Sequence, residues 1–131
     1  MNGYKLLYEW QRRLGLTDWC IKLCDNQEPD KMTLEECAGA TEWTESIKTA
    51  RIEIIDPKFY GDRIKPFDYE KTLVHELLHL KFSLISLDVN DLQTRYVHQI
   101  IDDLARAFVD AKRSEERVLE IPFEMLGKEE K

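Results

Sequence analysis

At 131 residues and 15.6 kDa, the chain has the length of one domain with a single hydrophobic core. Its 43% hydrophobic and 34% charged residues exclude a disordered chain or a fibrous repeat, and no apolar run approaches the roughly 20 residues needed to span a bilayer. A net charge of −7 opposes binding to nucleic acid or anionic lipid, and residues 1–10 lack the features of a signal peptide. We therefore expect a cytoplasmic protein without nucleic-acid or membrane partners.

The first half of the chain predicts one helix and three strands. Gly15 is well placed to end a helix near residue 14, whose helically spaced residues are Tyr4, Leu7, Tyr8, Gln11 and Leu14. Alternating patterns predict strands over residues 19–24, 37–43 and 47–55, the last two joined by a short hairpin turn. In the last strand, Ala50, Ile52 and Ile54 are expected on one face and Arg51 and Glu53 on the other.

The second half predicts two helices. Asp68 can cap the first of them, which would carry the apolar stripe Leu73, Leu77, Leu80 and Leu84. A polar turn at 88–91 leads to the next helix, with Val97, Ile101, Leu104 and Phe108 at helical spacing. The order of elements predicts an α+β domain over residues 1–112, in which a small three-stranded antiparallel sheet packs against helices, followed by a tail over 113–131.

Three cysteines occur, Cys20, Cys24 and Cys37. An odd number without a secretion signal favours reduced core thiols over a disulfide framework. Cys20 and Cys24 lack a matching downstream pair and lie too far apart on a strand to chelate one ion easily, so we expect no cysteine zinc site.

The most informative segment is residues 72–80, which contains an H-E-x-x-H motif formed by His75, Glu76 and His79. Residues four apart lie about one helical turn apart, so the two imidazoles can converge on one zinc ion. Glu76 points to one side, where its carboxylate can accept a proton from a water molecule without ligating the metal. A chain of this composition contains the motif by chance roughly 0.005 times, and burying unpartnered histidines is costly, so a merely solvated helix face is disfavoured.

A catalytic zinc ion typically needs a third protein ligand. The one remaining histidine is His98, on the next expected helix, and a helical hairpin can bring it to the motif. We expect it to be the third ligand rather than a core histidine. Asp102 follows four residues later on the same face; it either accepts an imidazole N–H from His75 or His98, or is a solvated carboxylate.

With this motif the chain resembles the zincin metallopeptidases, and among them the gluzincin-like group that includes the minigluzincins and small phage or prokaryotic metallopeptidases. In gluzincins the third ligand is a glutamate on a later helix, often followed four positions on by an acidic or amide residue. The resemblance covers roughly residues 1–112 and places His98 at the glutamate position and Asp102 at the later one. It implies a zincin fold, one zinc ion per chain, and a peptide or protein substrate. Histidine in place of glutamate departs from the family pattern and leaves the site more positive.

Two other groups share part of this pattern. SprT-like proteases use a third histidine, but their downstream His-Gly-x-x-Phe or Trp environment is absent from this sequence. Peptide deformylases add an upstream cysteine ligand, which Glu35-Glu36-Cys37 loosely matches, but their glycine-rich signature is absent and their motif helix lies near the C-terminus.

We therefore expect a zinc metallopeptidase with Glu76 as general base. Tyr69, Arg95 and Arg106 are polar candidates near the oxyanion, and the resemblance implies a substrate extended along the strand at 47–55. The alternative is a metal-binding regulatory or interaction protein that keeps the zincin scaffold with little or no proteolysis. A fourth protein ligand would favour that alternative, and an open fourth position the enzyme.

The tail is rich in Glu and Lys yet contains Val118, Leu119, Ile121, Phe123, Met125 and Leu126. An apolar cluster generally needs a surface to cover it, so we expect the tail to dock. Minigluzincins are similar in being latent, with a C-terminal segment in the cleft, which implies docking near the motif helix and restrained activity. The alternative is a tail that caps the hydrophobic core.

Overall fold

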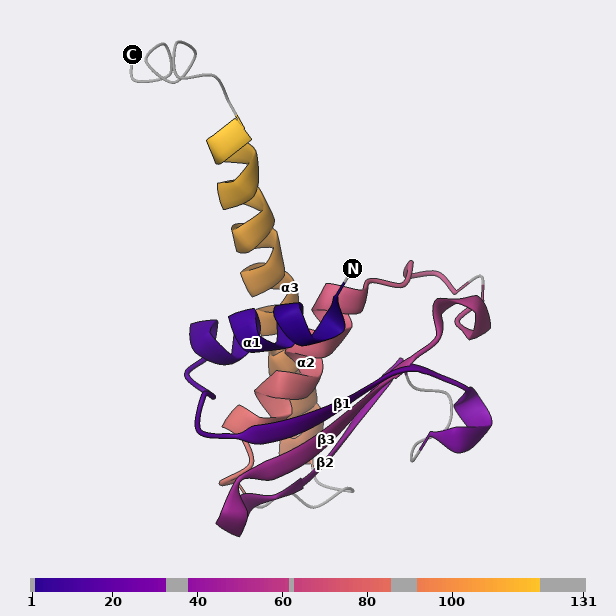
Figure 1. Cartoon of the computed structure of the whole chain (residues 1–131), viewed down its shortest axis with the longest axis vertical. Helices are drawn as coiled ribbons and strands as arrows, with labels where there is room; N and C mark the ends of the chain where they lie inside the picture. Colours follow the sequence, from indigo (N-terminus) through magenta and orange to yellow (C-terminus); the bar gives the residue numbers. More distant parts are fainter. Residues whose placement is uncertain (1, 33–37, 62, 86–91, 121–131) are drawn as a thin grey trace.

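A computed structural model describes residues 2–32, 38–61, 63–85 and 92–120. Over these residues the chain has an α+β fold with three α-helices and one three-stranded sheet, which confirms the expected class (Figure 1). The elements in chain order are α1 (Gly3–Arg13), β1 (Cys20–Gln27), β2 (Gly39–Thr44), β3 (Thr49–Ile55), α2 (Tyr69–Lys81) and α3 (Leu92–Glu120).

The sheet has the order β1-β3-β2, with β2 antiparallel to the central β3 and β1 parallel to it. The expectation of a purely antiparallel sheet is therefore wrong. Gln27 at the end of β1 pairs with Ile55, and Gly39 at the start of β2 pairs with Ile54, so the chain leaves β1 and enters β2 at the same end of the sheet. β3 then fills the position between them. Because β3 is flanked on both sides, it is not the free edge that an extended substrate would need.

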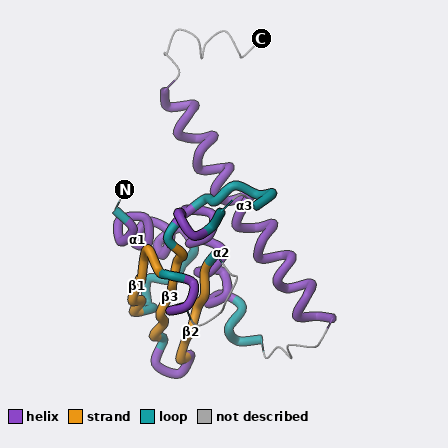
Figure 2. The backbone as a smooth tube through the Cα atoms, turned by 90° about the vertical axis from the view of Figure 1, so that its right-hand side faces the viewer, coloured by secondary structure: helices purple, strands orange, loops and turns teal. Residues whose placement is uncertain are grey.

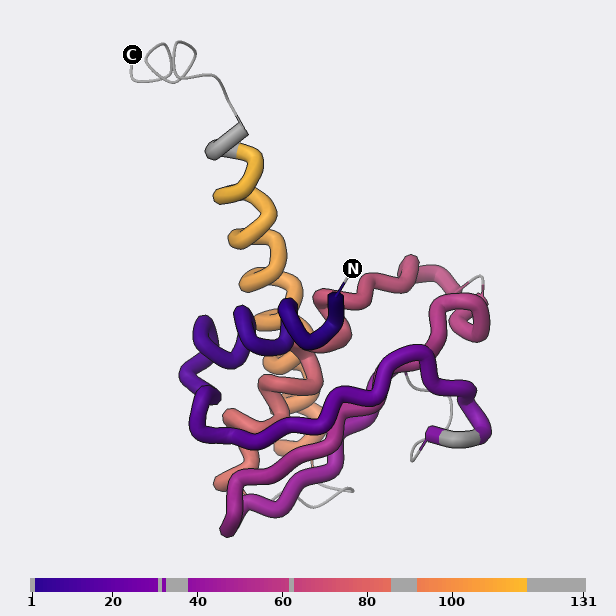
Figure 3. Tube along the Cα trace, viewed as in Figure 1, coloured from indigo at the N-terminus to yellow at the C-terminus, as the bar shows by residue number. Residues whose placement is uncertain are grey.

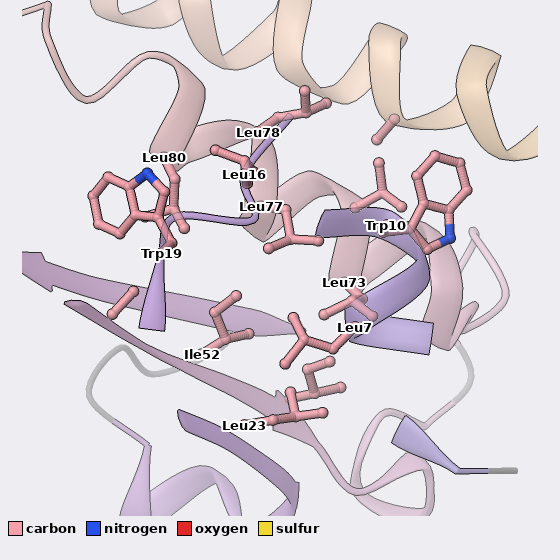
Figure 4. Close-up of a cluster of buried hydrophobic side chains, with 14 of the residues drawn as sticks. Leu7, Trp10, Leu16, Trp19, Leu23, Ile52, Leu73, Leu77, Leu78 and Leu80 are labelled. Atoms are coloured by element: carbon pink, nitrogen blue, oxygen red, sulfur yellow. The ribbon is translucent and has the colours of Figure 1, made fainter. Parts of the chain in front are cut away.

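The helices form a layer on one face of the sheet. α1 contacts β1 and α2 contacts β2 and β3, while α3 packs against α2 (Figures 1 and 2). Figure 4 shows the core at this junction, where buried side chains from α1, the sheet and α2 meet, among them Leu7, Trp10, Ile52, Leu73 and Leu77. The motif helix thus lies at the centre of the packing.

Both predicted helix boundaries are confirmed. The Asp68 side chain accepts a hydrogen bond from the Lys71 amide and caps α2. α1 ends with Leu14 as its C-cap, followed by Gly15 at φ 69°, a left-handed conformation that favours glycine.

The apolar stripes of the two later helices are confirmed in part. Leu84 follows the end of α2 at Lys81 and is 81% exposed, whereas the other expected stripe residues are buried, namely Leu73, Leu77 and Leu80. On α3, Phe108 is 38% exposed, and the fully buried line consists of Ile101, Ala105 and Val109. These three residues belong to the same core cluster as the buried residues of α2, so α3 packs lengthwise against α2.

The face of the sheet that carries Arg51 and Glu53 is partly buried. Glu53 is only 2% exposed, and its carboxylate lies 3.8 Å from the Arg51 guanidinium. Ile55 is also buried, in a small second cluster with Met32 and Ala40. Connecting segments therefore cover one end of this face, which a strand's own pattern does not reveal.

The remaining expectations concern the cysteines and the tail. Cys20 is exposed and Cys24 half-buried, both as free thiols, so neither is a core residue; Cys37 lies outside the described residues. α3 continues to Glu120, and its C-terminal turns project beyond α1 (Figure 3). The expected boundary after residue 112 thus falls within a helix, and residues 121–131 lie outside the described part, as does the turn at 88–91. None of the described helices has both the length and the apolar character to cross a membrane.

Candidate metal centre

The three histidines of the chain lie together. His75 and His79 are one turn apart on α2, and α3 runs antiparallel beside them and contributes His98. The ring centroids of His75 and His79 are 5.1 Å apart, and those of His79 and His98 are 4.9 Å apart. One nitrogen from each ring lies within 4.8 Å of the others. The packing of the two helices therefore brings together the three ligands expected from the sequence.

This group fits a zinc ion in chemistry and in scale. Nitrogens bonded to tetrahedral zinc at 2.0–2.1 Å are about 3.3 Å apart, so rotations that move each ring by about an ångström complete the geometry. Burial lowers the pKa of His79 to about 4, helped by the neighbouring charges of His75 and His98. The pKa of His75 is lowered by burial too, although Asp102 partly opposes this. Neutral imidazoles at pH 7 are the form that binds metal.

Glu76 is buried at the junction of α2 and β2, with 6% of its surface exposed. Thr41 on β2 donates a 2.6 Å hydrogen bond from its hydroxyl to Oε1 of Glu76. Burial raises the pKa of Glu76 to about 7, although the Thr41 hydrogen bond opposes the shift. A carboxyl group with a pKa near neutral can both accept and return a proton at physiological pH.

Gly39, also on β2, allows this close packing. A Cβ atom at Gly39 would lie 3.0 Å from Oε2 of Glu76 and 2.9 Å from Cγ2 of Thr72, so a side chain there would displace one of them. Sequence reasoning missed both Gly39 and Thr41. Gly39 lies inside the strand predicted over residues 37–43, and a glycine within a strand pattern often marks a close approach by another element, which was the available signal.

Asp102 lies beside His75, with 3.7 Å between its Oδ1 and the imidazole Nδ1. This is longer than a hydrogen bond but places the carboxylate where a small rotation would let it accept the imidazole proton. Asp102 also lies 3.5 Å from Arg106 Nε and 3.8 Å from Lys65 Nζ. Of the two histidines considered as its partner, the structure places it next to His75.

The polar candidates for the oxyanion are separated by the fold. Tyr69 lies in the first turn of α2, and its hydroxyl donates a hydrogen bond to Asp25 of β1. The Tyr69 hydroxyl is therefore engaged away from the histidine group. Arg95 is exposed near the start of α3, whereas Arg106 lines a groove together with His75 and Glu76. The deformylase-like residues Glu35, Glu36 and Cys37 lie outside the described residues.

Comparisons of the chain with known protein families, with curated proteins and with solved structures found no match. The resemblance to zincins therefore rests on the sequence motif alone.

Proposed function

We propose that the protein is a zinc-dependent metallopeptidase that hydrolyses a peptide bond with a water molecule. The observation that carries this proposal is the convergence of three histidine nitrogens within 4.8 Å of one another, two of them on α2, which also carries the buried Glu76, and the third on α3. His75, His79 and His98 would hold the ion. Bound there, zinc supplies Lewis-acid polarisation of the scissile carbonyl and acidifies the attacking water.

Glu76 acts as the general base in this proposal. As the water oxygen bonds to the carbonyl carbon, Glu76 takes one of its protons and then passes a proton to the amine nitrogen as the C–N bond breaks. Thr41 occupies Oε1, which leaves Oε2, on the Gly39 side, as the proton acceptor. Asp102 would hold the His75 ring in the orientation that the metal requires.

The alternative, a metal-binding regulatory or interaction protein, would be favoured by a closed site. Among the described residues, the candidate group contains three histidines and no fourth His, Cys, Asp or Glu. A structural zinc site generally uses four protein ligands, so this composition favours the enzyme. A buried carboxyl group beside the histidines also has no evident use in a structural site.

The test combines metal content with cleavage. We expect one zinc ion per chain and cleavage of members of a broad peptide library, abolished by a chelator and restored by zinc. Glu76→Gln should retain the zinc and the fold but lower kcat by at least about 100-fold, since it removes the proton acceptor. Loss of zinc in this variant, or retained cleavage, would show that the role of Glu76 is wrongly assigned.

A further inference from the structure

A groove opens beside the candidate metal centre, between the start of β2, Tyr60 and residues 65–67 of the connection before α2, and the facing sides of α2 and α3. Its volume is about 340 Å³, near the lower end of the roughly 300–1,000 Å³ typical of ligand sites. His75 and Glu76 line one part of it. A ligand in the groove would therefore lie next to the groups to which we assign peptide hydrolysis.

Three cationic side chains line this groove, each from a different element. Lys65 comes from the connection, Lys71 from α2 and Arg106 from α3. Three carboxyl groups also line the groove, those of Asp68, Glu76 and Asp102, so the availability of the cations depends on how these acids are paired. Glu76 accepts a hydrogen bond from Thr41. Positive groups that converge on a concave site favour an anionic ligand.

The carboxylates that line the groove do not fully pair with Lys65, Lys71 and Arg106. Asp68 is already bound by both guanidinium nitrogens of Arg113, at 2.7 and 2.9 Å. Asp102 is shared between Lys65 at 3.8 Å and Arg106 at 3.5 Å, and both contacts are longer than a hydrogen bond. One carboxylate thus faces two cations at once.

The other carboxylates that pair with Lys71 and Arg106 are exposed to solvent. Arg106 contacts Asp103, and Lys71 Nζ lies 3.2 Å from Asp110; these two carboxylate side chains are 56% and 62% exposed. Ion pairs so exposed are worth at most about 1 kcal/mol. A carboxylate entering the groove can therefore compete for Lys71 and Arg106.

We propose that this groove binds a carboxylate group of the peptide substrate, with Lys65, Lys71 and Arg106 as its partners. The carboxylate belongs either to the free C-terminus of the peptide or to an acidic side chain near the scissile bond, since both present the same planar anion. The guanidinium of Arg106 is suited to bind it through two parallel hydrogen bonds. The proposal deepens the proposed function and rests on it for the hydrolysis, but the recognition itself needs no metal.

The first experiment is an NMR titration of the full-length, ¹⁵N-labelled, metal-free protein with four N-acetylated pentapeptides. Two are penta-alanine with a free C-terminal carboxylate or a C-terminal amide, and two are amidated peptides with a central Asp or a central Asn. We expect at least one carboxylate peptide to bind about threefold or more tightly than its neutral counterpart, with shifts at the amides of Lys71 and Ala105. The pair that shows the difference identifies the source of the carboxylate. Equal affinities within both pairs would overturn the proposal.

Charge variants then locate the binding site. Lys65→Gln and Arg106→Gln should each reduce the preference for the carboxylate about two- to threefold. Lys22→Gln removes an exposed positive charge from β1, at the opposite edge of the sheet from β2, and should leave the preference unchanged. An equal loss in Lys22→Gln would mean that net charge alone acts, which contradicts the proposal. Zinc binding, measured separately, distinguishes failure of this proposal from failure of the proposed function.

Discussion

His98 is the one candidate ligand that α3 supplies, and its side chain is exposed, so replacing it should damage the site more than the fold. We expect His98→Ala to lower zinc affinity at least about 100-fold, and Asp102→Asn to lower it about 10- to 100-fold by releasing His75. Competition with a chromophoric chelator measures both. Gln99→Ala, an exposed neighbour on α3, is the matched control. Unchanged affinity in His98→Ala would point to a carboxylate as the third ligand.

Thr41 provides a second test, because it contacts Glu76 and lies outside the histidine motif. Thr41→Val keeps the shape of the side chain but removes the hydroxyl donor of the 2.6 Å hydrogen bond. We expect a loss of about 1–3 kcal/mol in the free energy of unfolding, and about a tenfold fall in kcat with little change in KM because Glu76 loses its fixed orientation. Thr41→Ser should restore both. Steady-state kinetics with an unchanged kcat in Thr41→Val would exclude a positioning role.

These residues show how much of the candidate site the sequence reveals. His75, Glu76 and His79 form a local pattern, and His98 was found because it is the one other histidine of the chain. Thr41 lies 35 residues before Glu76, and its contact exists only because β2 packs against α2. Pairings of this kind depend on the tertiary fold, which local spacing does not encode.

At the scale of elements, an ion pair between Asp68 and Arg113 links the N-terminus of α2 to α3. Asp68 caps the helix and binds Arg113 of α3 through both guanidinium nitrogens. Burial raises the pKa of Asp68, but the hydrogen bonds and charge of Arg113 and the Lys71 amide outweigh burial, so the pKa lies below its usual value. The ionised carboxylate therefore stabilises the contact between α2 and α3.

This contact predicts a pH dependence of stability. A carboxyl group with a lowered pKa in the folded state contributes stability above its unfolded pKa of about 3.9, and the contribution is lost as the pH falls through the folded pKa. We expect Asp68→Asn to be about 1–2 kcal/mol less stable than the native chain at pH 7. The difference should shrink below about pH 4. Urea unfolding at a series of pH values measures it, and a constant difference down to pH 2 would contradict the assignment.

The predictions of helix boundaries were correct where the sequence signal is local. The start of α2 follows from a capping residue before an apolar stripe, and the end of α1 from Gly15, both within one or two turns of chain. The direction of β1 relative to β3 was mispredicted because it depends on the order of the strands: β3 lies between β1 and β2, so β1 is parallel to it. The burial of Glu53 is likewise not predictable from the alternating pattern, which separates the two faces of a strand but does not show what packs on each.

Over the whole molecule, a polar cluster joins the three helices. Lys112 of α3 is 6% exposed and contacts Glu70 of α2 and Glu9 of α1, and Trp10 donates a 2.7 Å hydrogen bond to Glu70. Each buried charge here has a partner of opposite sign, as a stable buried ion pair requires. Because α1 takes part, the spacing of α2 and α3, and with it the histidine group, depends on the packing of all three helices.

The length of α3 limits what the tail can reach. From Glu120 back to the level of His98, the helix measures about 33 Å at 1.5 Å per residue. The apolar part of the tail, residues 121–126, can extend by at most about 20 Å from the end of the helix. A segment of this length is therefore too short to extend from Glu120 to the level of His98 along the intact helix. It can reach the level of Phe108, which is 38% exposed.

Because the histidine group lies beyond this reach, we expect the tail to contribute to stability rather than to cover the candidate metal centre. Removing residues 121–131 should lower the melting temperature by a few degrees, which corresponds to about 1 kcal/mol for a domain of this size, and should leave peptide cleavage per folded molecule unchanged. Differential scanning calorimetry and a peptide-cleavage assay on the same samples measure the two effects. A matched variant with Phe123→Ser and Leu126→Ser keeps the length of the chain and should reproduce the loss of stability, because apolar burial is its cause. A rise in cleavage with no change in stability would instead show that the tail blocks the site.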